Sequence, residues 1–117
     1  MSNKRYSEAV REISQKMKNL GTSVPEVMQK FQALNKACIA DGALDSKTKE
    51  LIALALGVAA RCEGCVAFHA KALVKMGATR EEVAETLGVA IQMGGGPSMM
   101  WAAEAMDAFE EFSANKA

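Results

Sequence analysis

Hydrophobic residues recur at helical spacing along almost the whole chain, so the pattern predicts a protein built of helices. Apolar side chains return every three or four positions between residues 6 and 20, 27 and 39, and 83 and 91. This is the repeat of one face of an α-helix. No stretch alternates apolar and polar residues for long enough to indicate a β-strand. We therefore predict an all-α fold of about six helices.

Glycine, proline and capping residues divide this pattern into its helices. The predicted helices cover residues from about 6 to 20, 25 to 39, 46 to 61, 62 to 76, 80 to 93 and 97 to 112. Thr22 or Ser23 is expected to cap the second helix, with Pro25 in its first turn. Asp45 is expected to cap the third, and Thr79 with Glu82 forms a capping box for the fifth. The remaining breaks fall at glycines, namely Gly21, Gly42, Gly77 and Gly94–Gly96.

Two of the predicted helices carry apolar faces that need a partner. The expected buried face of the second helix consists of Val27, Met28, Phe31, Leu34, Cys38 and Ile39. Cys38 is accordingly expected to be a core residue. In the third helix, residues 51–60 are all apolar, so this helix is expected to be buried on every side. A chain of 117 residues can hardly surround a helix alone, and we therefore expect a subunit interface.

Length, composition and charge narrow the class of protein. A chain of 117 residues is expected to form one domain. The 14 basic and 14 acidic residues cancel without a dense basic cluster, so no nucleic-acid partner is expected. The N-terminus has no apolar segment typical of an export signal. The apolar run at residues 51–60 is about half of what a membrane-spanning helix needs. We expect a soluble, cytoplasmic protein that does not associate with a membrane.

The most informative motif is a pair of cysteines followed by the only histidine. Cys62 and Cys65 lie three residues apart, and His69 follows four residues after Cys65. Residues three and four apart share one face of a helix, so two thiols would lie beside one imidazole. An imidazole accepts protons near neutral pH, and the thiolate is the reactive form of cysteine. In a reducing cytosol such a pair is more often catalytic or metal-binding than structural, so the spacing indicates redox chemistry.

The positions of the two cysteines suggest different roles. Cys65 lies one turn before His69 and in the first turn of the predicted helix, where the helix dipole favours an anion. We therefore expect Cys65 to be the nucleophile and Cys62, at the helix entrance, to resolve its oxidised form as a disulfide. A carboxylate that orients the imidazole would strengthen it as a base. Glu50, at the boundary of the apolar run, is the candidate, whereas Glu63 is expected to point to solvent.

These four residues resemble a known motif. Glu50 lies twelve residues before Cys62, and the further intervals to Cys65 and His69 are three and four. This spacing resembles the proton-relay motif of the AhpD-like alkylhydroperoxidases, within the carboxymuconolactone decarboxylase family. Residues 75–82 are similar to the family's turn into its next helix. The resemblance covers residues from about 24 to 112 of a single domain spanning residues 1–117.

The resemblance implies a fold, an assembly and an activity. It implies an all-helical fold that forms obligate homo-oligomers, as trimers or hexamers. It also implies a thiol-dependent peroxidase in which Cys65 reduces a hydroperoxide, Cys62 resolves the product, and Glu50 with His69 relays protons through a water. The reductant would be a dithiol such as a lipoyl group or a partner thiol protein, and no cofactor or metal ion is implied. Some members carry a second histidine between the cysteines, where this chain has Gly64.

Other interpretations of these residues stay open. The four side chains could together bind zinc, although a structural zinc site usually draws a second tight ligand pair from elsewhere. The decarboxylase branch of the family acts on a muconolactone and generally lacks the cysteine pair. Haem attachment is excluded because Val66, not histidine, follows Cys65. A further candidate feature is an apolar pocket for an organic hydroperoxide, formed by Met93, Met99, Met100 and Trp101.

Overall fold

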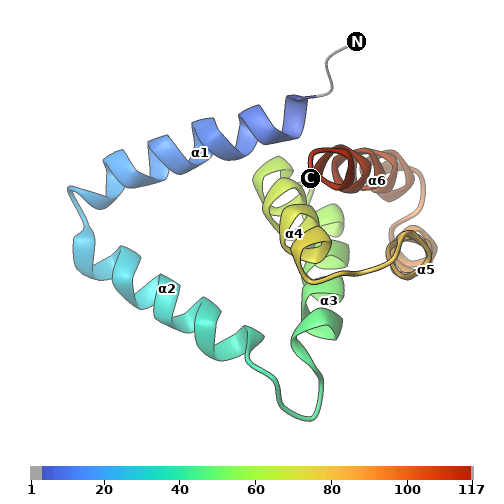
Figure 1. The fold of residues 1–117 in the computed structure, drawn as a ribbon, viewed down its shortest axis with the longest axis horizontal. Coiled ribbons are helices and arrows are strands. Elements are labelled where there is room, and N and C mark those ends of the chain that lie inside the picture. Colours follow the sequence, from blue (N-terminus) through green and yellow to red (C-terminus); the bar gives the residue numbers. More distant parts are fainter. Residues whose placement is uncertain (1–3, 117) are drawn as a thin grey trace.

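The computed structural model describes residues 4–116, which form six α-helices and no β-strand (Figure 1). The all-α prediction is thereby confirmed. The helices are α1 (Arg5–Gly21), α2 (Pro25–Ile39), α3 (Ser46–Ala59), α4 (Glu63–Lys75), α5 (Arg80–Gly94) and α6 (Gly96–Ala114).

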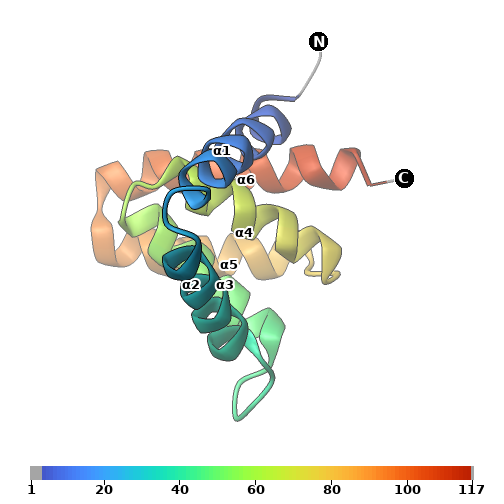
Figure 2. The same cartoon turned by 90° about the vertical axis from the view of Figure 1, so that its left-hand side faces the viewer.

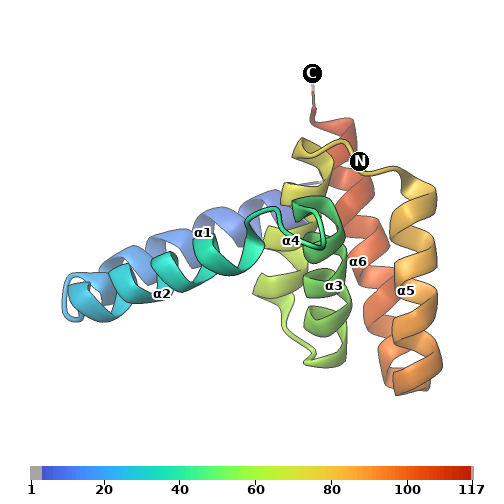
Figure 3. The same ribbon diagram turned by 90° about the horizontal axis from the view of Figure 1, so that it is seen from below.

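Helices α3 to α6 pack into a bundle, and α1 and α2 form a hairpin that projects from it (Figures 2 and 3). The first half of α1 lies on α4 and α6, whereas α2 contacts only α1 and α3. The radius of gyration is 14.5 Å, against about 13.4 Å for an average domain of this length. The projecting hairpin accounts for this more extended shape.

Local capping explains where several helices begin. The Asp45 carboxylate accepts the Thr48 N–H at 2.8 Å, as predicted for the start of α3. Thr79 and Glu82 form the predicted capping box of α5, with both reciprocal hydrogen bonds present. The predicted cap of α2 is wrong. Val24 occupies that position without a side-chain cap, and the Thr22 hydroxyl donates instead to the carbonyl of Asn19 at 2.7 Å.

The core lies between α4 and the helices around it. Small and β-branched side chains let these helices approach closely, which suits a chain with only 5% aromatic residues. The largest side chains with no exposed surface are Tyr6, Leu54, Leu73, Glu111, Val58, Val66 and Val83.

The fully buried Glu111 of α6 fastens the start of α1 to the bundle. Its carboxylate accepts the backbone N–H of Tyr6 at 3.0 Å and that of Ser7 at 2.7 Å. The residue before α1, Lys4, provides no side-chain cap. Glu111 therefore caps α1 from another helix, where the positive end of the helix dipole also favours a negative charge. This contact positions α1 across α4, next to the cysteines.

The predicted burial of the α2 face is wrong for the single chain. No residue of α2 is buried, and Val27, Phe31 and Leu34 are 63%, 57% and 55% exposed. Cys38, predicted to be a core residue, is an exposed free thiol. The physical reason is that α2 projects from the bundle and packs along one edge of α1 and α3 only.

The single chain does not bury α3 on all sides, and the subunit interface expected to cover the rest stays a prediction. Leu54 and Val58 face the core, but Ile52 and Leu56 are 44% and 64% exposed on the opposite side. Within residues 4–116, no helix has both the length and the hydrophobicity required to cross a membrane.

Candidate active site

The cysteine motif begins in the turn that ends α3. Arg61 has a φ of 55°, in the left-handed region. The N–H of Cys62 donates to the carbonyl of Gly57 at 3.0 Å, and the N–H of Arg61 donates to that of Val58 at 3.1 Å. These two bonds define a Schellman motif, which usually has glycine at the left-handed position. The turn places Cys62 directly at the start of α4.

The two cysteines occupy the N-terminus of α4, as the sequence predicts. Cys62 is the N-cap, and its sulfur accepts the N–H of Cys65 at 3.2 Å. Cys62 and Cys65 are joined by a disulfide with their Cα atoms 5.2 Å apart. Both residues are partly exposed. A sulfur at a helix N-terminus is stabilised as a thiolate by the N–H groups there.

His69 and Glu50 are brought together from α4 and α3. The imidazole Nδ1 lies 2.9 Å from Glu50 Oε2. The Glu50 side chain is 8% exposed and that of His69 is 32% exposed. A carboxylate can only accept hydrogen bonds, so an ionised Glu50 places the imidazole proton on Nδ1 and leaves Nε2 free as an acceptor. His69 also lies one helical turn after Cys65, on the same face of α4.

Helix α1 covers the other side of the cysteine motif, an arrangement that the sequence did not predict. The guanidinium of Arg5 lies 3.2 Å from the carboxylate of Glu63 and 2.7 Å from that of Glu104 on α6. A Cβ atom on Gly64 would lie 3.2 Å from Ile13 Cδ1. Glu63 therefore faces Arg5 rather than His69, and a side chain at Gly64 would require Ile13 of α1 to shift by a few tenths of an ångström.

Tyr6 reinforces the contact between α1 and α6. Its hydroxyl donates a hydrogen bond to Glu104, the same carboxylate that binds Arg5. Burial of the ring, followed by the hydrogen bond to Glu104, raises the pKa of the Tyr6 phenol above its ordinary value. The phenol therefore stays neutral and remains a hydrogen-bond donor throughout the physiological pH range.

The predicted methionine and tryptophan pocket is only partly formed. Met100 and Trp101 line a cavity of about 200 Å³ together with Arg5 and Glu104. Met93 and Met99 do not line it and are 80% and 54% exposed. Arg5 lines this cavity and also forms an ion pair with Glu63, which follows Cys62, so the cavity lies beside the cysteine motif.

The zinc interpretation requires four side chains around one ion. Within residues 4–116, no three histidine, cysteine, aspartate or glutamate side chains converge in a geometry that could hold a metal ion. Cys62 and Cys65 instead form a disulfide, and His69 is hydrogen-bonded to Glu50.

Comparisons with known proteins show which sequences and folds this chain resembles. A protein from Cupriavidus necator, described as uncharacterized, is 43% identical over 103 residues, covering 88% of this chain and 91% of that one. Uncharacterized protein 4 in the cox locus of Paracoccus denitrificans is 40% identical over 81 residues, which cover 69% of this chain and 73% of that one.

Two crystal structures are similar over almost the full chain. The first is the crystal structure of an apo carboxymuconolactone decarboxylase family protein from Legionella pneumophila. Its sequence is 54% identical to this chain, the TM-score is 0.92, and the match covers 94% of this chain and 98% of that one. The second is the crystal structure of a protein from Thermotoga maritima. Its sequence is 33% identical, the TM-score is 0.78, and the match covers 97% of this chain and 96% of that one. The model of the carboxymuconolactone decarboxylase family matches residues 25–108. The chain therefore belongs to the carboxymuconolactone decarboxylase family and has an AhpD-like fold.

Proposed function

We propose that this protein is a thiol-dependent peroxidase that reduces hydroperoxides through Cys62 and Cys65. The observation that carries the proposal is a disulfide between two partly exposed cysteines at a helix N-terminus, one turn from an imidazole that a buried carboxylate orients. Each part has a chemical role: the helix start favours a thiolate, and the imidazole exchanges protons near neutral pH.

The catalytic cycle consists of three balanced steps. The Cys65 thiolate attacks the terminal oxygen of the hydroperoxide ROOH and the O–O bond breaks. The alkoxide that leaves takes up a proton and becomes the alcohol ROH, and Cys65 is now a sulfenic acid. Cys62 then attacks this sulfur, releasing water and forming the disulfide. A dithiol reductant finally restores both thiols by two thiol–disulfide exchanges and becomes a disulfide itself.

His69 and Glu50 handle the protons of this cycle. The free Nε2 accepts the Cys65 proton, directly or through a water, and returns it to the alkoxide that leaves. Glu50, bonded to Nδ1, keeps the imidazole in the tautomer that accepts on Nε2 and stabilises the imidazolium that forms. The hydrogen bond from the Cys65 N–H to the Cys62 sulfur stabilises a thiolate on Cys62. This favours Cys62 as the group that attacks the sulfenic acid, and as the leaving thiolate when the reductant attacks the disulfide.

The test combines a thiol count with intact mass before and after one equivalent of an organic hydroperoxide. The reduced wild type should lose two of its three thiols and two hydrogens of mass. Cys65→Ser should lose all turnover with a dithiol such as dihydrolipoamide, and Cys62→Ser should stop at the sulfenic acid. Cys38→Ser is the matched control, because this thiol is exposed on α2 and is not part of the cysteine motif; this variant should turn over normally.

Two outcomes would contradict the proposal. Peroxide that is not consumed while all three thiols persist would remove the peroxidase assignment. Conversion of a muconolactone by a Cys62→Ser/Cys65→Ser double variant would favour the decarboxylase chemistry from which the family takes its name, since that chemistry needs neither thiol.

We also propose that the protein is a homo-oligomer in which another copy covers the exposed apolar side of α2. Phe31 and Leu34 are more than half exposed there, and Ile52 and Leu56 of α3 are similarly uncovered. Exposed apolar surface of this kind marks an interface. Light scattering should give a trimer or hexamer for the wild type and a smaller species for Leu34→Asp. A monomeric wild type would contradict this proposal without affecting the peroxidase assay.

A further inference from the structure

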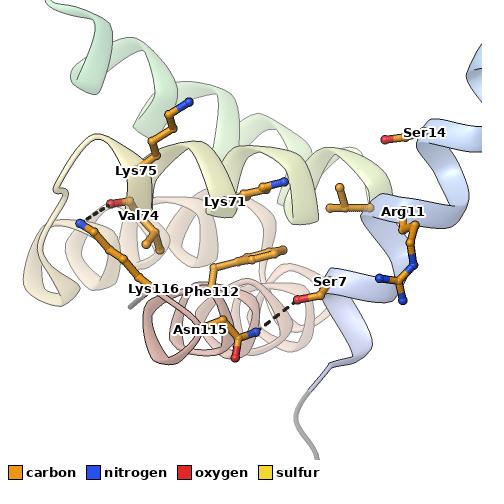
Figure 4. Close-up of a pocket in the computed structure, with 10 residues that line it drawn as sticks. Ser7, Arg11, Ser14, Lys71, Val74, Lys75, Phe112, Asn115 and Lys116 are labelled. Carbon is orange, nitrogen blue, oxygen red and sulfur yellow. Dashed lines mark hydrogen bonds between the residues drawn. The ribbon is translucent and has the colours of Figure 1, made fainter.

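A cavity of about 640 Å³ lies where α1, α4 and the end of α6 meet. Figure 4 shows its lining side chains, which come from all three helices and from the two residues after α6. Its volume falls within the range of about 300 to 1,000 Å³ that is typical of small-molecule sites. The lining residues are Ser7, Val10, Arg11, Ser14, Lys71, Val74, Lys75, Phe112, Asn115 and Lys116.

The rim of this cavity is positively charged. Four of its ten lining residues are cationic and none is acidic. Among the described residues, no carboxylate lies within ion-pairing distance of Arg11, Lys71 or Lys75, although other arginines and lysines of the chain do form such pairs. Three positive charges from two helices therefore surround one cavity without an anionic partner in residues 4–116. Such an arrangement attracts a negatively charged ligand.

The floor of the cavity is apolar. Val10, Val74 and Phe112 are each 8% exposed, and all three line the cavity. Two hydrogen bonds fix its walls: Asn115 Nδ2 donates to Ser7 Oγ at 3.3 Å, and Lys116 Nζ donates to the carbonyl of Val74 at 3.4 Å (Figure 4). An inorganic anion would gain nothing from this floor, and a neutral chain would gain nothing from the rim. The two features together fit a ligand with a charged head and an aliphatic tail.

The cavity is separate from the cysteine motif. None of Cys62, Cys65, His69 and Glu50 lines it. Lys71 and Lys75 lie six and ten residues after Cys65, which places them about 120° and 80° around α4 from that residue, in the direction opposite to His69. His69 lies only about 40° around from Cys65.

We propose that this cavity is a binding site for an aliphatic carboxylate, in addition to the redox site. The carboxylate head lies near Arg11 and Lys71, with Lys75 adding its positive charge at the edge of the cavity, and the alkyl chain covers Val10, Val74 and Phe112. Arg11 can bind a carboxylate through two parallel hydrogen bonds, whereas the lysines contribute charge. The binding requires no thiol and no redox step.

Isothermal titration of the full chain with sodium decanoate tests this site. Wild-type protein and Cys62→Ser/Cys65→Ser should bind decanoate equally. Lys71→Gln/Lys75→Gln should bind about 30-fold more weakly, taking each of the two exposed ion pairs at the upper end of its usual contribution. Lys36→Gln is the matched control, since it removes one charge from exposed α2 without touching the cavity, and its affinity should equal that of the wild type.

Two further titrations test the two parts of the ligand. Affinity should rise from butanoate through hexanoate to decanoate, by up to about fourfold for each buried CH2. Decanol and inorganic phosphate should both bind more weakly than decanoate. The proposal is overturned if decanoate does not bind, if the lysine double variant binds it as tightly as Lys36→Gln, or if phosphate alone or decanol binds as tightly as decanoate.

Discussion

Replacing Gly57 with alanine tests how closely α3 packs against the nucleophile proposed above. A Cβ atom at position 57 would lie 3.0 Å from the Cβ of Cys65 and 3.6 Å from its carbonyl carbon. Both Cβ atoms are fixed to helix backbones, so neither can rotate away. Carbon atoms pack best at about 3.5 to 4.0 Å, and α3 and α4 must therefore separate by several tenths of an ångström to admit the methyl group.

The magnitude follows from two opposing effects. Alanine is favoured over glycine in a helix interior by about 1 kcal/mol. Overpacking a close contact costs about 1 to 3 kcal/mol. Gly57→Ala should therefore lower the free energy of unfolding by about 0 to 2 kcal/mol, despite the better helix propensity.

Gly88→Ala is the matched control for this change. Gly88 is exposed within α5, and a Cβ there would meet nothing within 4 Å. Only the propensity effect remains, so Gly88→Ala should raise the free energy of unfolding by about 1 kcal/mol. The difference between the two variants then measures the contact with Cys65 alone.

Urea unfolding of both variants under reducing conditions gives the required free energies. Gly57→Ala should also slow the oxidation of the thiols by a hydroperoxide, because α4 with His69 moves relative to Glu50 on α3, whereas Gly88→Ala should not. Equal stabilisation by the two alanines would refute the packing argument. Slow oxidation in both variants would show that the loss of rate does not arise from the contact at Cys65.

Three further predictions concern single side chains. Arg61→Gly should raise the free energy of unfolding by about 1 kcal/mol in urea, because glycine adopts the φ of 55° without the cost that a side chain adds. Glu50→Gln should slow thiol oxidation by about 10- to 100-fold without unfolding the chain, and an unchanged rate would exclude Glu50 from the relay. The raised pKa of Tyr6 means that the unfolded chain loses the phenol proton first. The associated stability is present below about pH 10 and is lost as the pH rises further. Tyr6→Phe should therefore show a smaller fall in melting temperature between pH 9 and 11 than the wild type.

Features that depend on neighbouring residues could be predicted from the sequence. The caps at Asp45 and Thr79 use a hydroxyl or carboxylate and an N–H three residues later, so the spacing alone identifies them. The cysteine and histidine spacing similarly fixes which side chains share a face of α4. Glu50 is predicted from its position directly before an apolar run, and the structure brings its carboxylate to within 2.9 Å of the His69 imidazole.

Contacts between distant parts of the chain could not be predicted. Glu111 accepts hydrogen bonds from Tyr6 and Ser7, more than 100 residues earlier, and Arg5 pairs with Glu63 across 58 positions. Nothing local distinguishes Glu111 from the other acidic residues of α6, or Arg5 from the other basic residues near the N-terminus. Only the crossing of α1 over α4 and α6 selects these side chains.

The apolar face of α2 shows a different limit of sequence reasoning. Its spacing correctly indicates a helix, and its hydrophobicity indicates a face that water should not cover. Neither property says whether the partner surface belongs to the same chain. The structure leaves Phe31 and Leu34 more than half exposed. The prediction of burial was therefore wrong in assigning the surface that covers this face to the same chain.

The geometry of the cysteine motif depends on two adjoining helix ends rather than on a rigid loop. The Schellman turn after α3 fixes Arg61, and the next residue, Cys62, is already the N-cap of α4. Only residues 60–62 therefore separate α3 from α4. Any change that lengthens this connection would move both cysteines and His69 relative to Glu50 on α3, although the spacing between the cysteines stayed the same. The reactivity of the pair is consequently set by the packing of α3 on α4 as much as by the CxxC sequence.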